Sequence, residues 1–133
     1  MDKSSLEHLG NPERFAPYFY FIEAMKQVRL PAGNLLDAGC GGGVYGVLME
    51  RFYPQWNYCG TDDSADAIQQ ARELAPLGIF KVCEFTSNCF KAYDVVLVSQ
   101  AIERTEQPLT ELEFLLTQTH GYLILHQIKL ISG

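Results

Sequence analysis

The sequence predicts an α/β fold, in which a doubly wound, mainly parallel sheet carries helices on both faces. The first observation is the length, since 133 residues suffice for one domain with a buried core. The second is the alternation of short apolar segments with segments of helical periodicity. The third is YDVVLVS at 93–99, a nearly continuous apolar run typical of a strand covered on both faces. We expect a single domain over 1–133, with an N-terminal helical segment at 1–30 and an α/β core at 31–133.

The N-terminal segment is predicted to form an amphipathic helix within residues 12–29. Its apolar side chains recur at i, i+3, i+4 and i+7, which places them on one helical face. The Pro31-Ala-Gly33 stretch then ends the helix. The residues of the apolar face are Tyr18, Phe21, Ile22 and Met25.

The first part of the core alternates strand, helix, strand, helix and strand. Ser64 is expected to cap a helix, with Ile68, Ala71 and Ala75 as the apolar stripe of that helix. Parallel strands joined in this way have right-handed crossovers. The expected strands are 34–38, 56–61 and 79–85, and the expected helices are 44–52 and 65–75.

The last part of the chain is predicted to add the strand at 93–99, a helix and a fifth strand. Pro108 starts the helix, His120-Gly121 forms a turn, and the strand covers 122–128. This strand reads YLILHQI, an apolar edge without proline, and such edges pair readily with other chains. We therefore expect a second copy or a partner protein to cover the edge, or the chain to be a fragment of a longer one.

Composition excludes several classes of protein. The hydrophobic content is 47%, the charged content is 20%, and no window approaches the length of an apolar membrane span. The N-terminus is polar and acidic, unlike a targeting peptide, so we expect a cytoplasmic protein that does not contact membranes. The net charge is −6 and Lys and Arg form no run, which disfavours nucleic acid as a partner. The four cysteines lack metal-ligand spacing, so we expect reduced thiols and no metal site.

Two glycine patterns overlap in LLDAGCGGGVYG at 35–46. Gly41, Gly43 and Gly46 spell GxGxxG, the fingerprint of dinucleotide-binding proteins. That fingerprint also requires an acid about 20 residues further on, and Asp62 satisfies it. In a dinucleotide site, however, the first glycine follows the strand directly, whereas here Asp37 and another glycine intervene.

The second pattern is DxGxGxG, formed by Asp37, Gly39, Gly41 and Gly43. In open α/β sheets, ligands bind beyond the carboxyl ends of the strands, where the strand order reverses. The first core strand ends in this pattern, so the glycine loop belongs in that crevice. We interpret Gly46 as a helix-packing residue and the GxGxxG match as a by-product of glycine abundance.

LLDAGCGGG resembles the first motif of the class I S-adenosylmethionine-dependent methyltransferases, and the resemblance extends in register over residues 30–128. It implies a five-stranded Rossmann-like sheet in the order 3-2-1-4-5 and S-adenosylmethionine as the cofactor of a methyltransferase-like domain. The family usually has two further strands after the fifth, which this chain lacks. The other matching motifs are NYCGTDDS at 57–64, FKVCEF at 80–85, YDVVLVSQAIE at 93–103 and HGYLIL at 120–125.

The resemblance also implies which residues contact the nucleoside part of the cofactor. Asp62 would accept hydrogen bonds from both ribose hydroxyls, Asp63 and Phe85 would border the adenine, and Glu84 would lie near its amino group. Each residue has a simpler interpretation as well. The aspartates could be solvated acids beside a helix cap, Glu84 a surface residue and Phe85 part of the core.

The methionine part of the cofactor would lie along the glycine loop. The resemblance places the backbone at Gly39, Gly41 and Gly43 beside it, and the main-chain carbonyl of Ser99 at its ammonium group. Asp37 would orient the loop or reach that ammonium. Tyr18 and Tyr45 could close over the cofactor, but aromatic side chains on helical faces are usually core, so we favour packing.

No catalytic dyad or triad is visible, which is compatible with methyl transfer, a displacement that depends on positioning and water exclusion. The candidate catalytic residues are Gln100, Glu103 and Arg104, in the loop after the fourth strand. Many small-molecule methyltransferases have LEH here, whereas this chain has IER, so Arg104 replaces the expected histidine.

Three functions follow as alternatives. The first is S-adenosylmethionine-dependent methyl transfer to a small-molecule acceptor. The second is a non-catalytic methyltransferase-like subunit or truncated remnant that binds the cofactor or a partner protein. The third is an NAD(P)-dependent oxidoreductase, which the register of the glycines disfavours.

Overall fold

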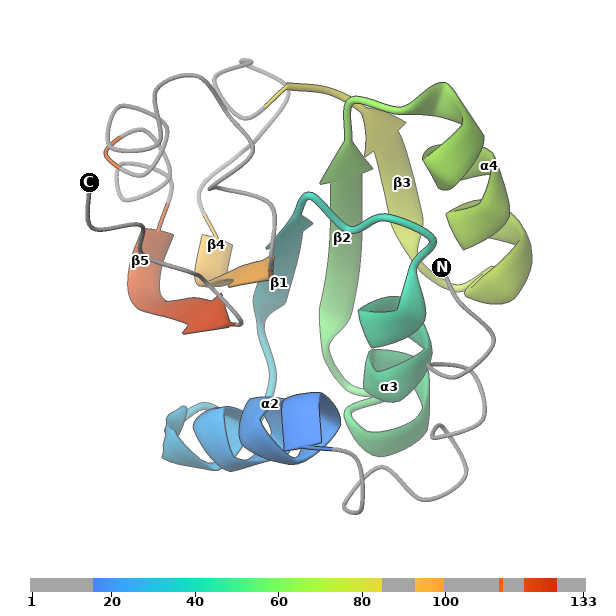
Figure 1. The fold of residues 1–133 in the computed structure, drawn as a ribbon. Coiled ribbons are helices and arrows are strands. Elements are labelled where there is room, and N and C mark those ends of the chain that lie inside the picture. Colours follow the sequence, from blue (N-terminus) through green and yellow to red (C-terminus); the bar gives the residue numbers. More distant parts are fainter. Residues whose placement is uncertain (1–15, 85–92, 100–112, 114–118, 127–133) are drawn as a thin grey trace.

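The computed structural model describes residues 16–84, 93–99, 113 and 119–126 (Figure 1). Its centre is a five-stranded sheet in the order β3-β2-β1-β4-β5, with every neighbouring pair parallel. The predicted fold class and strand order are therefore confirmed. The strands are β1 (Asn34–Ala38), β2 (Asn57–Asp62), β3 (Ile79–Val82), β4 (Tyr93–Ser99) and β5 (Thr119–His126).

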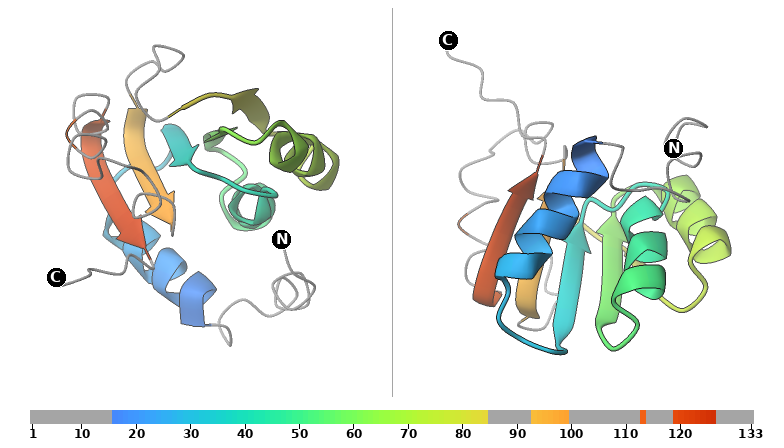
Figure 2. Two further views of the ribbon diagram at one scale, coloured as in Figure 1. Left: turned by 45° about the horizontal axis from the view of Figure 1, so that its top comes forward. Right: turned by 90° about the horizontal axis from the view of Figure 1, so that it is seen from below.

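Within the described segments, three helices cover one face of the sheet (Figure 2). They are α2 (Ala16–Gln27), α3 (Val44–Phe52) and α4 (Ala65–Leu74). Their buried side chains form one cluster with those of Leu35, Val95 and Leu97, which point from β1 and β4 toward the helices. The further helix expected to start at Pro108 falls on residues of which the structure describes only Glu113.

The opposite face of the sheet is also buried. Leu36, Val96 and Val98 have no exposed surface and alternate along their strands with the residues that face the helices. Burial on both faces explains why β4 is apolar at nearly every position.

The predicted apolar stripes of the helices are confirmed. Tyr18, Phe21 and Met25 are buried on α2, and Ile68 and Ala71 are buried on α4. The side chain of Ser64 accepts a hydrogen bond from the backbone of α4 and caps the helix, as expected.

The prediction of a turn at His120-Gly121 is wrong, because β5 already starts at Thr119. The pairing of β4 with β5 is irregular between Tyr93 and Val95. A Cβ atom on Gly121 would lie 2.8 Å from the carbonyl oxygen of Asp94. The glycine therefore allows two strands to approach closely at an irregular pairing, and it does not reverse the chain.

The described cysteines differ in their oxidation state. Cys40 and Cys59 are free and buried, but Cys83 is disulfide-bonded, so the expectation of reduced thiols is wrong at Cys83. Sequence spacing could not reveal this bond, since pairing depends on proximity in the fold.

Among the helices that the structure describes, none is long and apolar enough to cross a membrane.

Candidate functional site

The glycine loop between β1 and α3 lies at the carboxyl ends of the strands, as expected (Figure 1). The amides of Gly39 and Cys40 both donate to the carbonyl oxygen of Thr61, each at 2.8 Å. The loop turns through three glycines with positive φ, which other residues rarely adopt. These are Gly39 (78°), Gly41 (54°) and Gly43 (88°). The loop is thus held against the end of β2 in one defined conformation.

The glycines of the loop have different neighbours. A Cβ atom on Gly41 would meet no heavy atom within 4 Å, whereas one on Gly43 would lie 2.8 Å from the Cβ of Ala71 in α4. A Cβ atom on Gly46 would lie 3.1 Å from the Cβ of Ala75. Gly43 and Gly46 therefore permit close packing of the loop and α3 against α4. Gly41, by contrast, borders open space, where a ligand has room to approach the backbone.

Asp62, the last residue of β2, is hydrogen-bonded to both the glycine loop and the N-cap residue of α4. Its Oδ2 accepts a hydrogen bond from the amide of Gly41 at 2.9 Å, and its Oδ1 accepts one from the amide of Ser64 at 3.0 Å. The side chain is half-buried. Each carboxylate oxygen has two lone pairs, so Asp62 retains capacity for two further donors. The hydrogen bond to Gly41, across 21 positions, was not predicted from the sequence.

Asp37 lies deeper, facing the helices, and is only 1% exposed. Its Oδ2 accepts a hydrogen bond from the hydroxyl of Tyr58 at 2.5 Å, and its Oδ1 is buried without a partner among the described residues. Burial raises the pKa of Asp37 to about 7; the hydrogen bond from Tyr58 lowers it and the charge of Asp62 raises it. A buried acceptor without a donor is unfavourable, which makes this oxygen a candidate ligand contact.

The hydroxyl and thiol groups beside Asp37 stay neutral. Burial, followed by the charge of Asp37, raises the pKa of Tyr58 well above its usual value. Burial, followed by the charges of Asp37 and Asp62, raises the pKa of the Cys40 thiol above its usual range. Since the thiolate is the nucleophilic form, Cys40 is not a nucleophile here.

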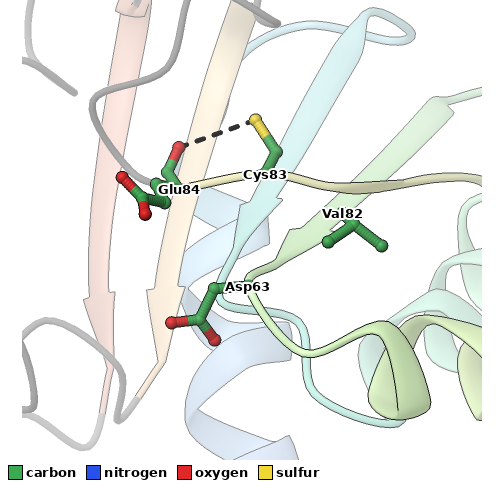
Figure 3. A pocket seen from close by; sticks show the side chains of 4 residues that line it. All are labelled: Asp63, Val82, Cys83 and Glu84. Carbon is green, nitrogen blue, oxygen red and sulfur yellow. Dashed lines mark hydrogen bonds between the residues drawn. The ribbon is translucent and has the colours of Figure 1, made fainter.

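A shallow pocket lies beyond the ends of β2 and β3 (Figure 3). Its volume is about 350 Å³ and its lining is Asp63, Val82, Cys83 and Glu84. Asp63 and Glu84 are both exposed. The structure thus brings together the two acids that the resemblance assigns to the adenine end of the cofactor.

The remaining predicted site residues lie at the end of a described segment or outside the described segments. Ser99 ends β4, and since Val98 is in register with Ala38, Ser99 lies at the same end of the sheet as Gly39. Phe85, Gln100, Glu103 and Arg104 lie outside the described residues.

The aromatic residues at the start of α2 and α3 pack against one another. The rings of Tyr18 and Tyr45 meet edge to face with centroids 5.8 Å apart, and those of Phe21 and Tyr45 are 5.0 Å apart. All three are buried. The structure agrees with our preference for packing over closure on a ligand.

Tyr58 is the site residue that the sequence did not reveal. From the sequence, Tyr58 had no predicted role beyond its place in the strand and in the NYCGTDDS motif, although a buried tyrosine usually requires a partner for its hydroxyl. Tyr58 is in register with Leu35, and Asp37 lies two residues further along β1 on the same face. The pairing register supplies the contact, and the sequence alone does not fix that register.

Comparison with known proteins identifies the family. A family model described as "Methyltransferase domain" matches residues 30–130. This chain belongs to the methyltransferase domain family. Among solved structures, that of the plantazolicin methyltransferase BpumL in complex with a pentazolic desmethylPZN analog and SAH has a TM-score of 0.64 and 26% identity. The match covers 89% of this chain and 44% of that one.

The curated relatives match over shorter segments. Trans-aconitate 2-methyltransferase of Afipia carboxidovorans is 44% identical over 52 residues, which are 39% of this chain and 20% of the relative. Ribosomal RNA small subunit methyltransferase C of Stutzerimonas stutzeri is 44% identical over 51 residues, 38% of this chain and 15% of the relative. The matched segments therefore span a fifth or less of either relative, and the two relatives differ in the acceptor that their names state.

Proposed function

We propose that this chain binds S-adenosylmethionine at the carboxyl ends of β1, β2 and β3 and transfers the methyl group to a small-molecule acceptor. One observation carries the proposal: in a methyltransferase-family chain, the loop after β1 is hydrogen-bonded to the acid that ends β2. This arrangement leaves Gly41 beside open space and holds a carboxylate next to it. A ligand with a diol and a cationic amino-acid end fits those groups.

In this proposal Asp62 accepts hydrogen bonds from the two ribose hydroxyls while it keeps the amides of Gly41 and Ser64. The free lone pairs of its half-buried carboxylate support that role. Asp63 and Glu84 border the adenine in the pocket beyond β3. Phe85, the other adenine residue implied by the resemblance, stays a prediction.

The methionine end of the cofactor follows the glycine loop toward the buried carboxyl group of Asp37. The open position of Gly41, and the position of Ser99 at the same end of the sheet as the glycine loop, support a binding path along this end. The unpartnered Oδ1 of Asp37 suits an ammonium group or a water molecule bound to it. Gly43 contributes the turn of the loop and its packing on α4.

The electrostatics of the crevice favour this cofactor over a dinucleotide. Asp37, Asp62, Asp63 and Glu84 all contribute carboxyl groups to the crevice or its rim. Such a site attracts the sulfonium and ammonium groups of S-adenosylmethionine and repels the phosphates of NAD or NADP. The third alternative, a nicotinamide-dependent oxidoreductase, is therefore the weakest.

Bound S-adenosylmethionine supplies an already activated methyl group on a sulfonium sulfur. The residues of this chain then need to orient that carbon and exclude water, and an added acid or base is not essential. Gln100, Glu103 and Arg104 stay candidate residues for any proton transfer from the acceptor. The net charge of −6, with no run of Lys or Arg, favours a small-molecule acceptor over ribosomal RNA.

A non-catalytic function is the second candidate. Arg104 stands where many small-molecule methyltransferases have a histidine, and β5 pairs only with β4 among the strands that the structure describes. A chain that binds the cofactor and presents β5 to a second copy or a partner protein would have both features.

Ligand-induced thermal stabilisation distinguishes these functions. S-adenosylmethionine and its demethylated product, at about 100 times their dissociation constants, are expected to stabilise the chain by about 2.7 kcal/mol. NAD and NADP are expected to have no effect. Stabilisation by NAD alone, or by none of the four, would overturn the proposal. Binding without methyl transfer to any of a panel of small-molecule acceptors would support the non-catalytic candidate.

A further inference from the structure

The contact between Tyr58 and Asp37 joins two buried polar groups that the sheet places side by side. Tyr58 Oη lies 2.5 Å from Asp37 Oδ2, and the Tyr58 ring packs edge to face on Phe80 with centroids 5.6 Å apart. Gly46 comes close to the same ring, since a Cβ atom on it would lie 3.1 Å from Tyr58 Cε1. The phenol is therefore fixed from two sides and holds one carboxylate oxygen in place.

The other oxygen, Oδ1, is the unsatisfied one. It is buried and has no hydrogen-bond partner among the described residues. Asp37 is followed after one residue by the glycine loop, and it interacts electrostatically with Asp62 and Cys40. The free oxygen thus belongs to the carboxylate that lies beneath the proposed path of the methionine end.

No cation compensates the Asp37 carboxylate within the part of the chain that is described. The titratable groups that interact with it are Tyr58, Asp62 and Cys59 on β2 and Cys40 in the loop. The helices packed on this face contribute two buried titratable groups, Tyr18 on α2 and Tyr45 on α3, and the facing residues of β4, Val95 and Leu97, do not titrate. All of these groups are acids or neutral, so none of the described groups around Asp37 supplies a cation, and the cationic end of a ligand suits this position.

We propose that Tyr58 is a positioning residue for the cofactor: its hydroxyl holds Oδ2 of Asp37 so that Oδ1 accepts from the cationic end of the ligand. This inference rests on the proposed function. The ligand cation favours the ionised carboxylate, so cofactor affinity rises as Asp37 loses its proton. Because the Tyr58 hydrogen bond favours the same ionised form, it extends tight binding to lower pH.

Tyr58→Phe tests this role, because it removes the hydroxyl and leaves the ring that packs on Phe80. We expect the midpoint of the affinity–pH profile for S-adenosylmethionine to rise by about one pH unit. Affinity at pH 6.5 is then expected to fall about tenfold, against less than threefold at pH 8. The matched control is Tyr53→Phe, which removes a half-buried hydroxyl beyond the opposite end of α3 and leaves the profile unchanged.

A second variant separates a positioning effect from a general disturbance. In an Asp37→Asn background the carboxylate is gone, so adding Tyr58→Phe is expected to cause no further change in the pH profile. Carboxyl ¹³C NMR of the ligand-free protein gives an independent reading, in which Tyr58→Phe raises the Asp37 titration midpoint.

The outcomes distinguish this inference from the proposed function. Failure of the wild-type chain to bind S-adenosylmethionine would overturn both. Binding by the wild type with the same pH profile in Tyr58→Phe would overturn the role of Tyr58 alone. An equal effect of Tyr58→Phe with and without Asp37→Asn would also overturn it, because Tyr58 would then act independently of Asp37.

Discussion

The carboxyl group beside the glycine loop (the loop side of the site) and those that line the pocket (the pocket side) differ in burial and in hydrogen bonding. Asp37, on the loop side, is 1% exposed and hydrogen-bonded through one oxygen, with the other oxygen unpartnered among the described residues. Asp63 and Glu84, on the pocket side, are exposed at the ends of β2 and β3. Asp62 lies between the two sides and has both oxygens hydrogen-bonded to backbone amides.

The difference indicates which acid would gain most from a bound ligand. Water satisfies an exposed carboxylate, so Asp63 and Glu84 are expected to have little effect on folding and a modest effect on binding. A buried carboxylate destabilises the fold unless a donor or cation reaches it. In the proposed function, Asp37 therefore lowers the stability of the ligand-free fold and raises the affinity for the cofactor, whereas the exposed Asp63 and Glu84 do not lower stability.

The largest effect is expected at the acid that joins the two sides. Asp62→Ala removes the proposed ribose acceptor and the partner of the Gly41 amide. Two hydrogen bonds to a charged group correspond to a loss of cofactor affinity of about 100-fold or more, measured by calorimetry. Asp66→Ala, which removes an exposed acid from the same helix–strand corner, is the charge-matched control. Equal affinity of Asp62→Ala and wild type would refute the ribose assignment.

An intermediate effect, dependent on pH, is expected at Asp37. Its folded-state pKa of about 7 lies above the ordinary value of 3.8, so the folded protein binds more protons than the unfolded chain between these values. The contribution of this group to the free energy of unfolding is therefore fully present below about pH 4. It decreases as pH rises to about 7, by up to about 1.4 kcal/mol per pH unit.

Asp37→Asn removes this titration, so the variant is expected to gain stability relative to wild type as pH rises from 4 to 7. Urea unfolding of both proteins across that range measures the gain, with Asp66→Asn as the exposed control. The variant is also expected to bind S-adenosylmethionine about tenfold more weakly at pH 8. A constant stability difference across the range would show that Asp37 does not titrate as described.

The smallest effect is expected on the pocket side. Glu84→Gln keeps the size of an exposed side chain and removes its charge, so cofactor affinity is expected to fall by no more than about threefold. The loss is expected to shrink further at 0.5 M salt, since exposed charges are screened. A tenfold loss that persists in salt would place Glu84 in a buried contact and would remove the contrast between the two sides.

Much of the fold was predictable because it depends on local pattern. The apolar run at 93–99 and the segment at 34–38 gave strands with the bounds that the structure has, and Ser64 marked the start of α4. The strand order followed from the family resemblance and is confirmed. The prediction at Gly121 failed because a glycine before an apolar run indicates a turn and a close strand contact equally well.

The site was predictable only in part, because its contacts join residues that are distant in sequence. The glycine loop and Asp62 carry recognisable spacing, and the structure places both at the carboxyl ends of the strands. The hydrogen bonds from Tyr58 to Asp37 and from Gly41 to Asp62 depend on the register of β1 with β2. No local pattern encodes that register. The contrast between the buried Asp37 and the exposed Asp63 and Glu84 therefore became visible only in the structure.

Backbone amide NMR of the 15.0 kDa chain during titration with S-adenosylmethionine tests the central claim most directly. The claim places the cofactor along the ends of β1, β2 and β3. Saturable shifts are expected at the amides of Gly39, Gly41, Asp63 and Glu84, with little change at Gly33 and Asn57 at the opposite end of the sheet. Saturable shifts confined to that opposite end, or none at all, would contradict the claim.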